Sequence, residues 1–263
     1  MKHISKYIED CLANGRFFFE KEEALQELRL SQVAFNLQAL RLSKKKLIKK
    51  LRSGLFMIIP HEYRNFGTVP PHWLIDPLMR HLKQNYYVGL LTAASLYGAT
   101  HQQPIGFHVI TTKVTKCIHL DKTTIYFHVS RSCLSSKTTP LTTPAGYTYL
   151  STKAQTILDL VFFHQTCGYF SNVAMVIKEL SENIDIKDFD TVIANEARSH
   201  VLQRLGYILE ILGYPKLANR LDNALSKRSL RLFLLRPDLP KTKLSVKSKR
   251  WNLVINDTLE IEE

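Results

Sequence analysis

The chain has 263 residues, of which 45% are hydrophobic and 22% are charged, a composition typical of globular proteins and unlike that of disordered or fibrous ones. Lys and Arg number 36 against 23 Asp and Glu, which gives a formal net charge of +13. This excess of cations indicates a polyanionic partner, either nucleic acid or an anionic membrane surface. The length fits one large domain or two smaller ones, and we expect two.

The sequence shows neither a membrane span nor a secretory signal. No run reaches the roughly 18 to 20 consecutive apolar residues that cross a bilayer. Glu9 and Asp10 lie where a signal peptide requires an apolar stretch. We therefore expect a cytoplasmic protein without a membrane partner. The cysteines form no CxxC pair, so we expect reduced thiols and neither a disulfide framework nor a zinc site; they are Cys11, Cys117, Cys133 and Cys167.

The first sixty residues predict three helices followed by a β-hairpin. Apolar spacing and capping residues predict helices over residues 4–15, 21–28 and 31–43. Ser31 is a good N-cap for the third of these helices. Two short strands, before and after a reversal at Ser53 and Gly54, complete the pattern. Three helices and a hairpin make a winged helix-turn-helix, which we assign to residues 1–69.

The remaining residues, 70–263, predict a mixed α/β domain, so the fold class is α+β. A linker with Gly67 and two prolines precedes a short helix that carries Trp73. Strands are expected at FHVITT, KCIHL and TTIYFHV, and late strands at SLRLFLLRP and WNLVIN. Thr152 and Gln155 fit a capping box before a helix, and two more helices are expected at NVAMVIKEL and HVLQRLGYILEILG.

The strongest local signal is a stretch without any acid, from Leu30 to Arg52. It holds seven cations: Arg41, Lys44, Lys45, Lys46, Lys49, Lys50 and Arg52. Each Lys or Arg that neutralises a phosphate releases a counterion, so cations clustered on a helix end and an adjoining hairpin give affinity for a duplex of any sequence. A merely solvated basic face is the alternative.

Base reading would fall to the third helix, which offers two apolar stripes. One stripe contains Val33, Leu37 and Leu40, and the other contains Phe35, Ala39 and Leu42. Core positions about four, eight and eleven residues after the N-cap are usual in winged helix-turn-helix helices, and this spacing selects the second stripe. The polar residues that this choice exposes, together with the N-cap, are the candidate DNA contacts: Ser31, Gln32, Asn36 and Arg41.

A second basic region lies between Lys216 and Trp251, where 11 cations face two acids, Asp222 and Asp238. It could extend the footprint on a duplex, meet an acidic protein or RNA, or form a soluble tail. The candidate residues of this secondary basic surface are Arg228, Arg231, Lys247, Lys249 and Arg250.

No motif of an enzyme is present. The sequence lacks GxxxxGK[ST], GxGxxG, HExxH and GxSxG, so we expect no catalytic residue, metal or cofactor. Asp188 and Asp190 lie among acids of a helix start and are not expected to bind a metal. Two rival functions stay open: a nucleic-acid-processing enzyme targeted by a winged domain, and a one-component regulator whose second domain binds a small ligand.

Five segments resemble the AbiEi family of antitoxins, from bacterial type IV toxin-antitoxin systems that act in abortive infection, a form of phage defence. They are ISKYIEDCLANGRFFFEKEEAL, GLFMIIPHEYRNFG, PPHWLIDPLMRHL, YYVGLLTAASLYGATHQQP and QRLGYILEILG, so the resemblance runs nearly end to end. The third and fourth segments are the most specific, because an unrelated domain has no reason to join WLIDPLM, YYVGLLTAA and HQQP in this order.

The resemblance implies an autorepressor whose winged domain binds inverted repeats in its own operon promoter, with two copies on the DNA. It implies that the region from Trp73 onward counteracts a nucleotidyltransferase toxin encoded alongside, whether or not the two form a stable complex. No catalytic residue is implied. The chain departs from the family pattern where Lys46 replaces a Gly before the first wing strand, and in its long basic end past Leu239.

Overall fold

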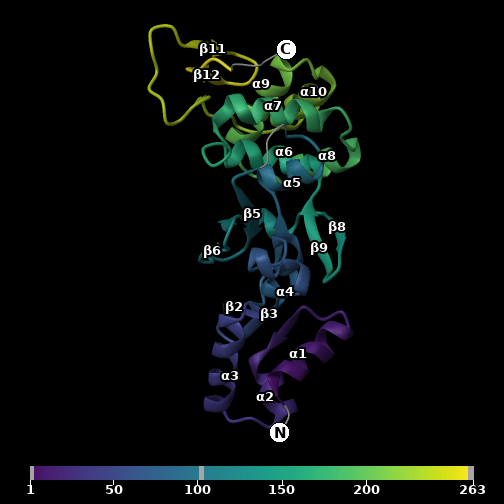
Figure 1. The fold of residues 1–263 in the computed structure, drawn as a ribbon. Helices are drawn as coiled ribbons and strands as arrows, with labels where there is room; N and C mark the ends of the chain where they lie inside the picture. Colours follow the sequence, from purple (N-terminus) through teal and green to yellow (C-terminus); the bar gives the residue numbers. More distant parts are fainter. Residues whose placement is uncertain (1–2, 101–103, 260–263) are drawn as a thin grey trace. The chain divides into compact units, whose positions relative to one another are not determined.

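The computed structural model describes residues 3–100 and 104–259 as a mixed α+β fold (Figure 1). Two compact units are present. The first comprises Met1–Tyr87, Ile105–Val129 and Pro140–Tyr149, and the second comprises Val88–Pro104, Ser130–Thr139 and Leu150–Glu263. The first unit thus contains more of the chain than the winged region assigned to residues 1–69, and the boundary after residue 69 stays a prediction.

The N-terminal part of the first unit contains three helices and a small antiparallel sheet. The helices are α1 (Ile4–Ala13), α2 (Lys21–Leu28) and α3 (Gln32–Lys44). The strands are β1 (Phe18–Glu20), β2 (Ile48–Arg52) and β3 (Leu55–Ile58), in the order β1-β3-β2. The three helices and the β2-β3 hairpin were predicted from the sequence, whereas β1 was not.

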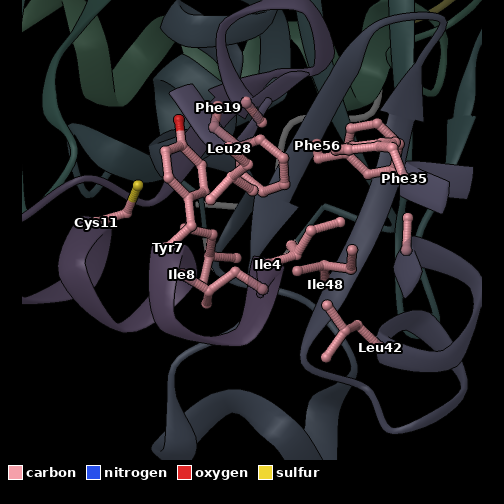
Figure 2. Close-up of a cluster of buried hydrophobic side chains, with 13 residues drawn as sticks. Ile4, Tyr7, Ile8, Cys11, Phe19, Leu28, Phe35, Leu42, Ile48 and Phe56 are labelled. Atoms are coloured by element: carbon pink, nitrogen blue, oxygen red, sulfur yellow. The ribbon is translucent and has the colours of Figure 1, made fainter. Parts of the chain in front are cut away.

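Aromatic rings join these elements into one core (Figure 2). The ring of Phe19 on β1 lies 5.5 Å from that of Tyr7 on α1 and 5.4 Å from that of Phe56 on β3. Phe56 in turn meets Phe35 of α3 edge to face at 5.5 Å. Such pairs add about 0.5 to 1.5 kcal/mol beyond the burial of their area. The core therefore fixes which face of α3 points inward.

The rest of the first unit continues from this core. It contains the 3-10 helix η1 (His61–Phe66), α4 (Pro71–His81), β5 (Gly106–Thr111), β6 (Ile118–His119) and β7 (Thr124–Val129). The strands β5 and β7 pair in parallel over six residues, and β6 pairs antiparallel to β7. With β4 (Tyr86–Val88), β8 (Thr138–Thr143) and β9 (Gly146–Ser151), they form a sheet of order β6-β7-β5-β4-β9-β8. The β8 and β9 strands were not predicted.

The second unit is mainly helical. Its helices are α5 (Leu90–Leu96), α6 (Lys153–Phe162), α7 (Tyr169–Ser181), α8 (Ile186–Asn195), α9 (Ser199–Ile211) and α10 (Pro215–Leu225). Helix α6 is central, because it packs against α5, α7, α8 and α9 and is buried from Ala154 through Val161. Thr152 caps it as predicted, with Oγ1 accepting from the Gln155 amide at 3.2 Å. The start of α8 was expected near Asp188, whereas α10 was not predicted.

A small C-terminal sheet packs on α9. It consists of β10 (Phe233–Leu234), β12 (Leu253–Ile255) and β11 (Val246–Ser248), in that order. The two strands predicted at SLRLFLLRP and WNLVIN are confirmed as β10 and β12, and β11, which lies between them in the sequence, was not predicted. The buried Trp251 ring lies against Gly206 of α9, where any Cβ would collide with it. Trp251 Nε1 donates to Glu210 at 2.6 Å, so the packing and this hydrogen bond both attach the C-terminal segment to α9.

Candidate nucleic-acid interface

A short turn joins α2 to α3 and sets the start of α3. Arg29 takes the left-handed conformation (φ 50°) after the last turn of α2. Ser31 then caps α3, with its Oγ accepting from the Ala34 amide at 3.2 Å. At the other side of the helix, Gln38 Oε1 accepts from the Ile4 amide at the start of α1, at 3.2 Å. The cap and this bond fix the position and rotation of α3.

The buried stripe of α3 consists of Phe35, Ala39 and Leu42, as the spacing from Ser31 predicted. The candidate base contacts are exposed as that choice required: Ser31, Gln32, Asn36 and Arg41. Their exposure makes them available to a partner.

Five of the seven cations of the acid-free stretch are exposed: Arg41, Lys44, Lys45, Lys46 and Lys50. Within the described parts of the chain, Arg41, Lys44, Lys45 and Lys50 form no salt bridge. Lys46 stands where α3 ends and has φ 55°, a conformation that favours Gly. The five charges thus gather at the end of α3 and on the following strand, with little compensation from their own unit.

The other two cations are engaged inside the first unit. Lys49 Nζ lies 2.9 Å from Asp121 Oδ1, and its side chain is 28% exposed. The hydrogen bond and charge of Lys49 hold the pKa of Asp121 below its usual value. Arg52 donates to the carbonyl oxygen of Lys116. Lys49 and Arg52 therefore position the hairpin, and a phosphate would have to compete for them.

The β2-β3 hairpin is held at its turn. Gly54 has φ 84°, which allows the tight reversal after Ser53. Pairing shifts register between Lys50 and Arg52, so the strand carries an irregularity there. His81 of α4 braces the turn, with Nε2 2.9 Å from the Ser53 carbonyl oxygen. Its Nδ1 lies 3.0 Å from the Glu20 carboxylate, which ties β1 to the same point.

The C-terminal basic segment is different, because its arginines other than Arg231 are engaged. Arg250 forms ion pairs with Glu210 and with Asp222, the latter at 2.9 Å. Arg228 donates to the carbonyl oxygens of Ile193 and Glu196, at 3.4 and 2.7 Å, and so caps the end of α8. The remaining candidates of this surface are exposed: Arg231, Lys247 and Lys249.

The two acids singled out in the sequence, Asp188 and Asp190, both lie on α8 of the second unit. Asp188 is buried in the first turn of α8, whereas Asp190 pairs with Arg220. The cavity beside Asp188 has a volume of about 20 Å³, which is the space of roughly one water. Among residues 3–100 and 104–259, no group of three or more His, Cys, Asp or Glu could hold a metal ion. No helix in the same described residues is long and apolar enough to span a membrane.

Residues 87–211 match the family model described as the AbiEi antitoxin C-terminal domain. The chain therefore carries the antitoxin domain of the AbiEi family, and the resemblance predicted from the sequence is confirmed. This domain supports an antitoxin role in a toxin-antitoxin system and implies a toxin as partner.

A solved structure shows a similar fold. The crystal structure of the RV2827C protein from Mycobacterium tuberculosis aligns with a TM-score of 0.67 and 14% sequence identity, over 95% of this chain and 90% of that one. At this identity the likeness concerns the fold alone. No curated protein matches the sequence.

One feature of the candidate interface was missed from the sequence. The apolar stripe that was not assigned to the core, formed by Val33, Leu37 and Leu40, faces outward on α3 and is exposed. Its regular spacing is visible in the sequence, where it forms the second apolar stripe of the helix. The outward face of α3 is consequently more apolar than the polar contacts predicted for it.

Proposed function

We propose that the N-terminal elements α1 to β3 form a winged helix-turn-helix and that the chain is an antitoxin and transcriptional autorepressor. The observation that carries the proposal is the row of exposed cations on α3 and β2, on a stretch with no acid from Leu30 to Arg52. The short α2-α3 turn and the β2-β3 hairpin support it, because both are features of that motif.

In this proposal α3 enters the major groove of double-stranded DNA. Its N-terminal half presents Ser31, Gln32 and Asn36 to the base edges, and Asn and Gln side chains can pair with adenine. Arg41 pairs with guanine or a phosphate. The lysines at the end of α3 and on β2 neutralise phosphates and set the position on the duplex.

Two copies on an inverted repeat would occupy adjacent half-sites in the promoter of the chain's own operon. In this architecture the half-sites lie about one helical turn apart, roughly 34 to 36 Å, so the symmetry of the operator matches that of the bound pair. Repression would then depend cooperatively on protein concentration.

The antitoxin activity is assigned to the second part of the chain, which we divide from the first after residue 69. The match over residues 87–211 supports this assignment, since it does not include α3 or the β2-β3 hairpin. The proposed target is a cognate nucleotidyltransferase toxin. The proposal requires that the chain counteract this toxin, and a stable complex of the two is not required.

A separation-of-function variant tests the proposal in the full-length chain. Lys44, Lys45 and Lys46 are replaced together by Glu, which reverses exposed charges outside the matched antitoxin domain. A promoter reporter measures repression, and growth on co-expression with the adjacent toxin measures rescue. We expect loss of repression with rescue retained. A folded variant that represses normally, or that loses rescue together with repression, contradicts the division of labour.

A further inference from the structure

The outward face of α3 is apolar along its middle. The exposed fractions are 69% for Val33, 54% for Leu37 and 55% for Leu40. Residues three and four apart are neighbours on a helix surface, so the three side chains form one continuous stripe. Single exposed apolar residues are common, but a stripe of three on one helix marks a surface that meets a partner.

Folding of the first unit does not require this stripe. The core already takes Phe35, Ala39 and Leu42 from the opposite side of α3 (Figure 2). The stripe is bordered by polar and charged residues, with Asn36 on one flank and Arg41 on the other. Lys44 continues the same line, four residues beyond Leu40. A partner of this face must therefore satisfy apolar side chains and cations together.

The charges distinguish between possible partners. Face-to-face contact with a second copy would place the cations of two α3 helices in one interface without any acid of α3 to pair with them, and uncompensated like charges repel. A duplex has the required combination, because phosphates flank a major groove in which thymine presents its C5-methyl group. The stripe from Val33 to Leu40 is about 10 Å long at 1.5 Å per residue, which corresponds to roughly three base pairs.

We propose that Val33, Leu37 and Leu40 contact thymine C5-methyl groups in the major groove, so that half-site recognition depends on these methyls as well as on hydrogen bonds. The inference rests on the proposed DNA binding and names the bases that it reads. Leu37 lies at the centre of the stripe, so its truncation should have the largest effect.

The test compares thymine with uracil, which lacks only the methyl group. Duplexes are first selected by the full-length protein from a pool with a random centre. The best duplex is then synthesised with thymidine or with deoxyuridine at the half-site, and affinities are measured by fluorescence anisotropy. Each lost methyl contact should weaken binding about fourfold, since one buried methyl-sized group contributes roughly 0.8 kcal/mol. The wild-type protein should thus distinguish the two duplexes clearly.

Variants connect this discrimination to the stripe. In Leu37→Ala the ratio of the two affinities should fall towards one, whereas Leu37→Met should restore it. Leu232→Ala is the matched control, because Leu232 is 48% exposed but belongs to the C-terminal segment; its ratio should equal that of the wild type.

Three outcomes overturn the inference. Equal affinity of the wild-type protein for both duplexes would show that it does not contact the methyl groups, while the proposed DNA binding would stand. An unchanged ratio in Leu37→Ala, together with a change in oligomeric state or toxin neutralisation, makes the stripe a protein interface. Failure to select any duplex contradicts the proposed function itself and with it this inference.

Discussion

The acid-free stretch around α3 and the C-terminal basic segment have similar charge in the sequence but different surroundings in the structure. Around α3, five of seven cations are exposed, and four of these form no salt bridge with a described residue. In the C-terminal segment four of the five arginines are held by acids or carbonyl oxygens, as with Arg250 on Glu210 and Asp222, whereas Arg231 and the lysines are exposed. Because a phosphate competes poorly with a partner already in place, the engaged arginines of the C-terminal segment are poorer candidates for a duplex than the exposed cations around α3.

The comparison also separates cations that hold the fold together from cations that are available to bind an anion. Arg236 pairs with Asp238 at 2.6 Å and with Asp257 at 3.1 Å, and Arg204 donates to the carbonyl oxygen of Leu234. These contacts hold the C-terminal sheet in place. A count of charges over a segment therefore overstates its capacity to bind an anion wherever the partners lie far away in sequence.

The largest expected effect is on duplex affinity. Replacing Lys44, Lys45 and Lys46 by Glu removes three cations and adds three anions, so affinity should fall at least roughly 1,000-fold at low salt. The matched control reverses three exposed charges of the other segment: Arg231, Lys247 and Lys249. We expect the control to bind within about threefold of the wild type. Anisotropy titrations measure both, and equal losses would refute the comparison.

The second effect is on folding of the C-terminal segment. Trp251→Ala should lower the free energy of unfolding by about 3 to 5 kcal/mol, because it empties the space beside Gly206 and removes the bond to Glu210. Leu244→Ala in the same segment should cost less than about 0.5 kcal/mol, since that side chain is 91% exposed. Denaturant titrations followed by circular dichroism check both values. A small cost for Trp251→Ala would mean that the tail is held by other contacts.

The third effect is on the pH dependence of the free energy of unfolding, which limits the pH range in which the two basic regions can be compared. Burial, and then the charge of His128, lowers the pKa of His108 from 6.5 to about 4. Between pH 6.5 and 4 the unfolded chain binds more protons at this histidine than the folded chain does. The contribution of neutral His108 to the free energy of unfolding is therefore fully present above pH 6.5 and is lost as the pH falls towards 4. The loss should reach roughly 3 kcal/mol.

The His108→Gln variant provides the control for this effect. It removes the titrating group that lies 3.0 Å from His128 Nε2, so unfolding should depend less on pH between 7 and 4. Denaturant titrations at each pH give the comparison. An unchanged pH dependence in the variant would assign the effect to other groups.

The smallest effect separates charge from backbone strain. Lys46→Gly removes a cation at φ 55°, so stability should stay constant or rise by up to about 1 kcal/mol. The salt dependence of duplex binding should decrease by about one unit of slope. Lys83→Gly is a close control, because Lys83 is also exposed and has φ 52°. The salt dependence of duplex binding should not change in Lys83→Gly. A similar decrease in this variant would show that the loss of any exposed lysine has the same effect, wherever it lies.

The sequence predicted what depends on local rules. The cap at Ser31 and the apolar period gave the rotation of α3, and Ser53-Gly54 gave the hairpin. It could not predict β1, a three-residue strand whose conformation depends on pairing with β3. Strand β8 was missed because its threonine-rich residues carry little apolar alternation, whereas β9 contains the β-forming residues Tyr147, Tyr149 and Leu150 and could have been predicted.

The candidate site was predictable in composition but not in detail. Lys49 and Arg52 were expected to contact DNA, and both make contacts with residues far along the chain, Asp121 and Lys116. Such contacts are tertiary and have no local signature. The spacing from Ser31 already places the stripe of Val33, Leu37 and Leu40 outside the core, but it does not show which partner this stripe would meet.

The salt dependence of duplex binding tests the central claim most directly. Anisotropy titrations of the full-length protein with the selected duplex, between about 50 and 300 mM salt, give the slope of log affinity against log salt concentration. Five exposed cations that contact phosphates predict a slope of roughly −4 to −5 for each bound copy. A slope near zero would contradict the claim that this face of α3 and β2 binds double-stranded DNA.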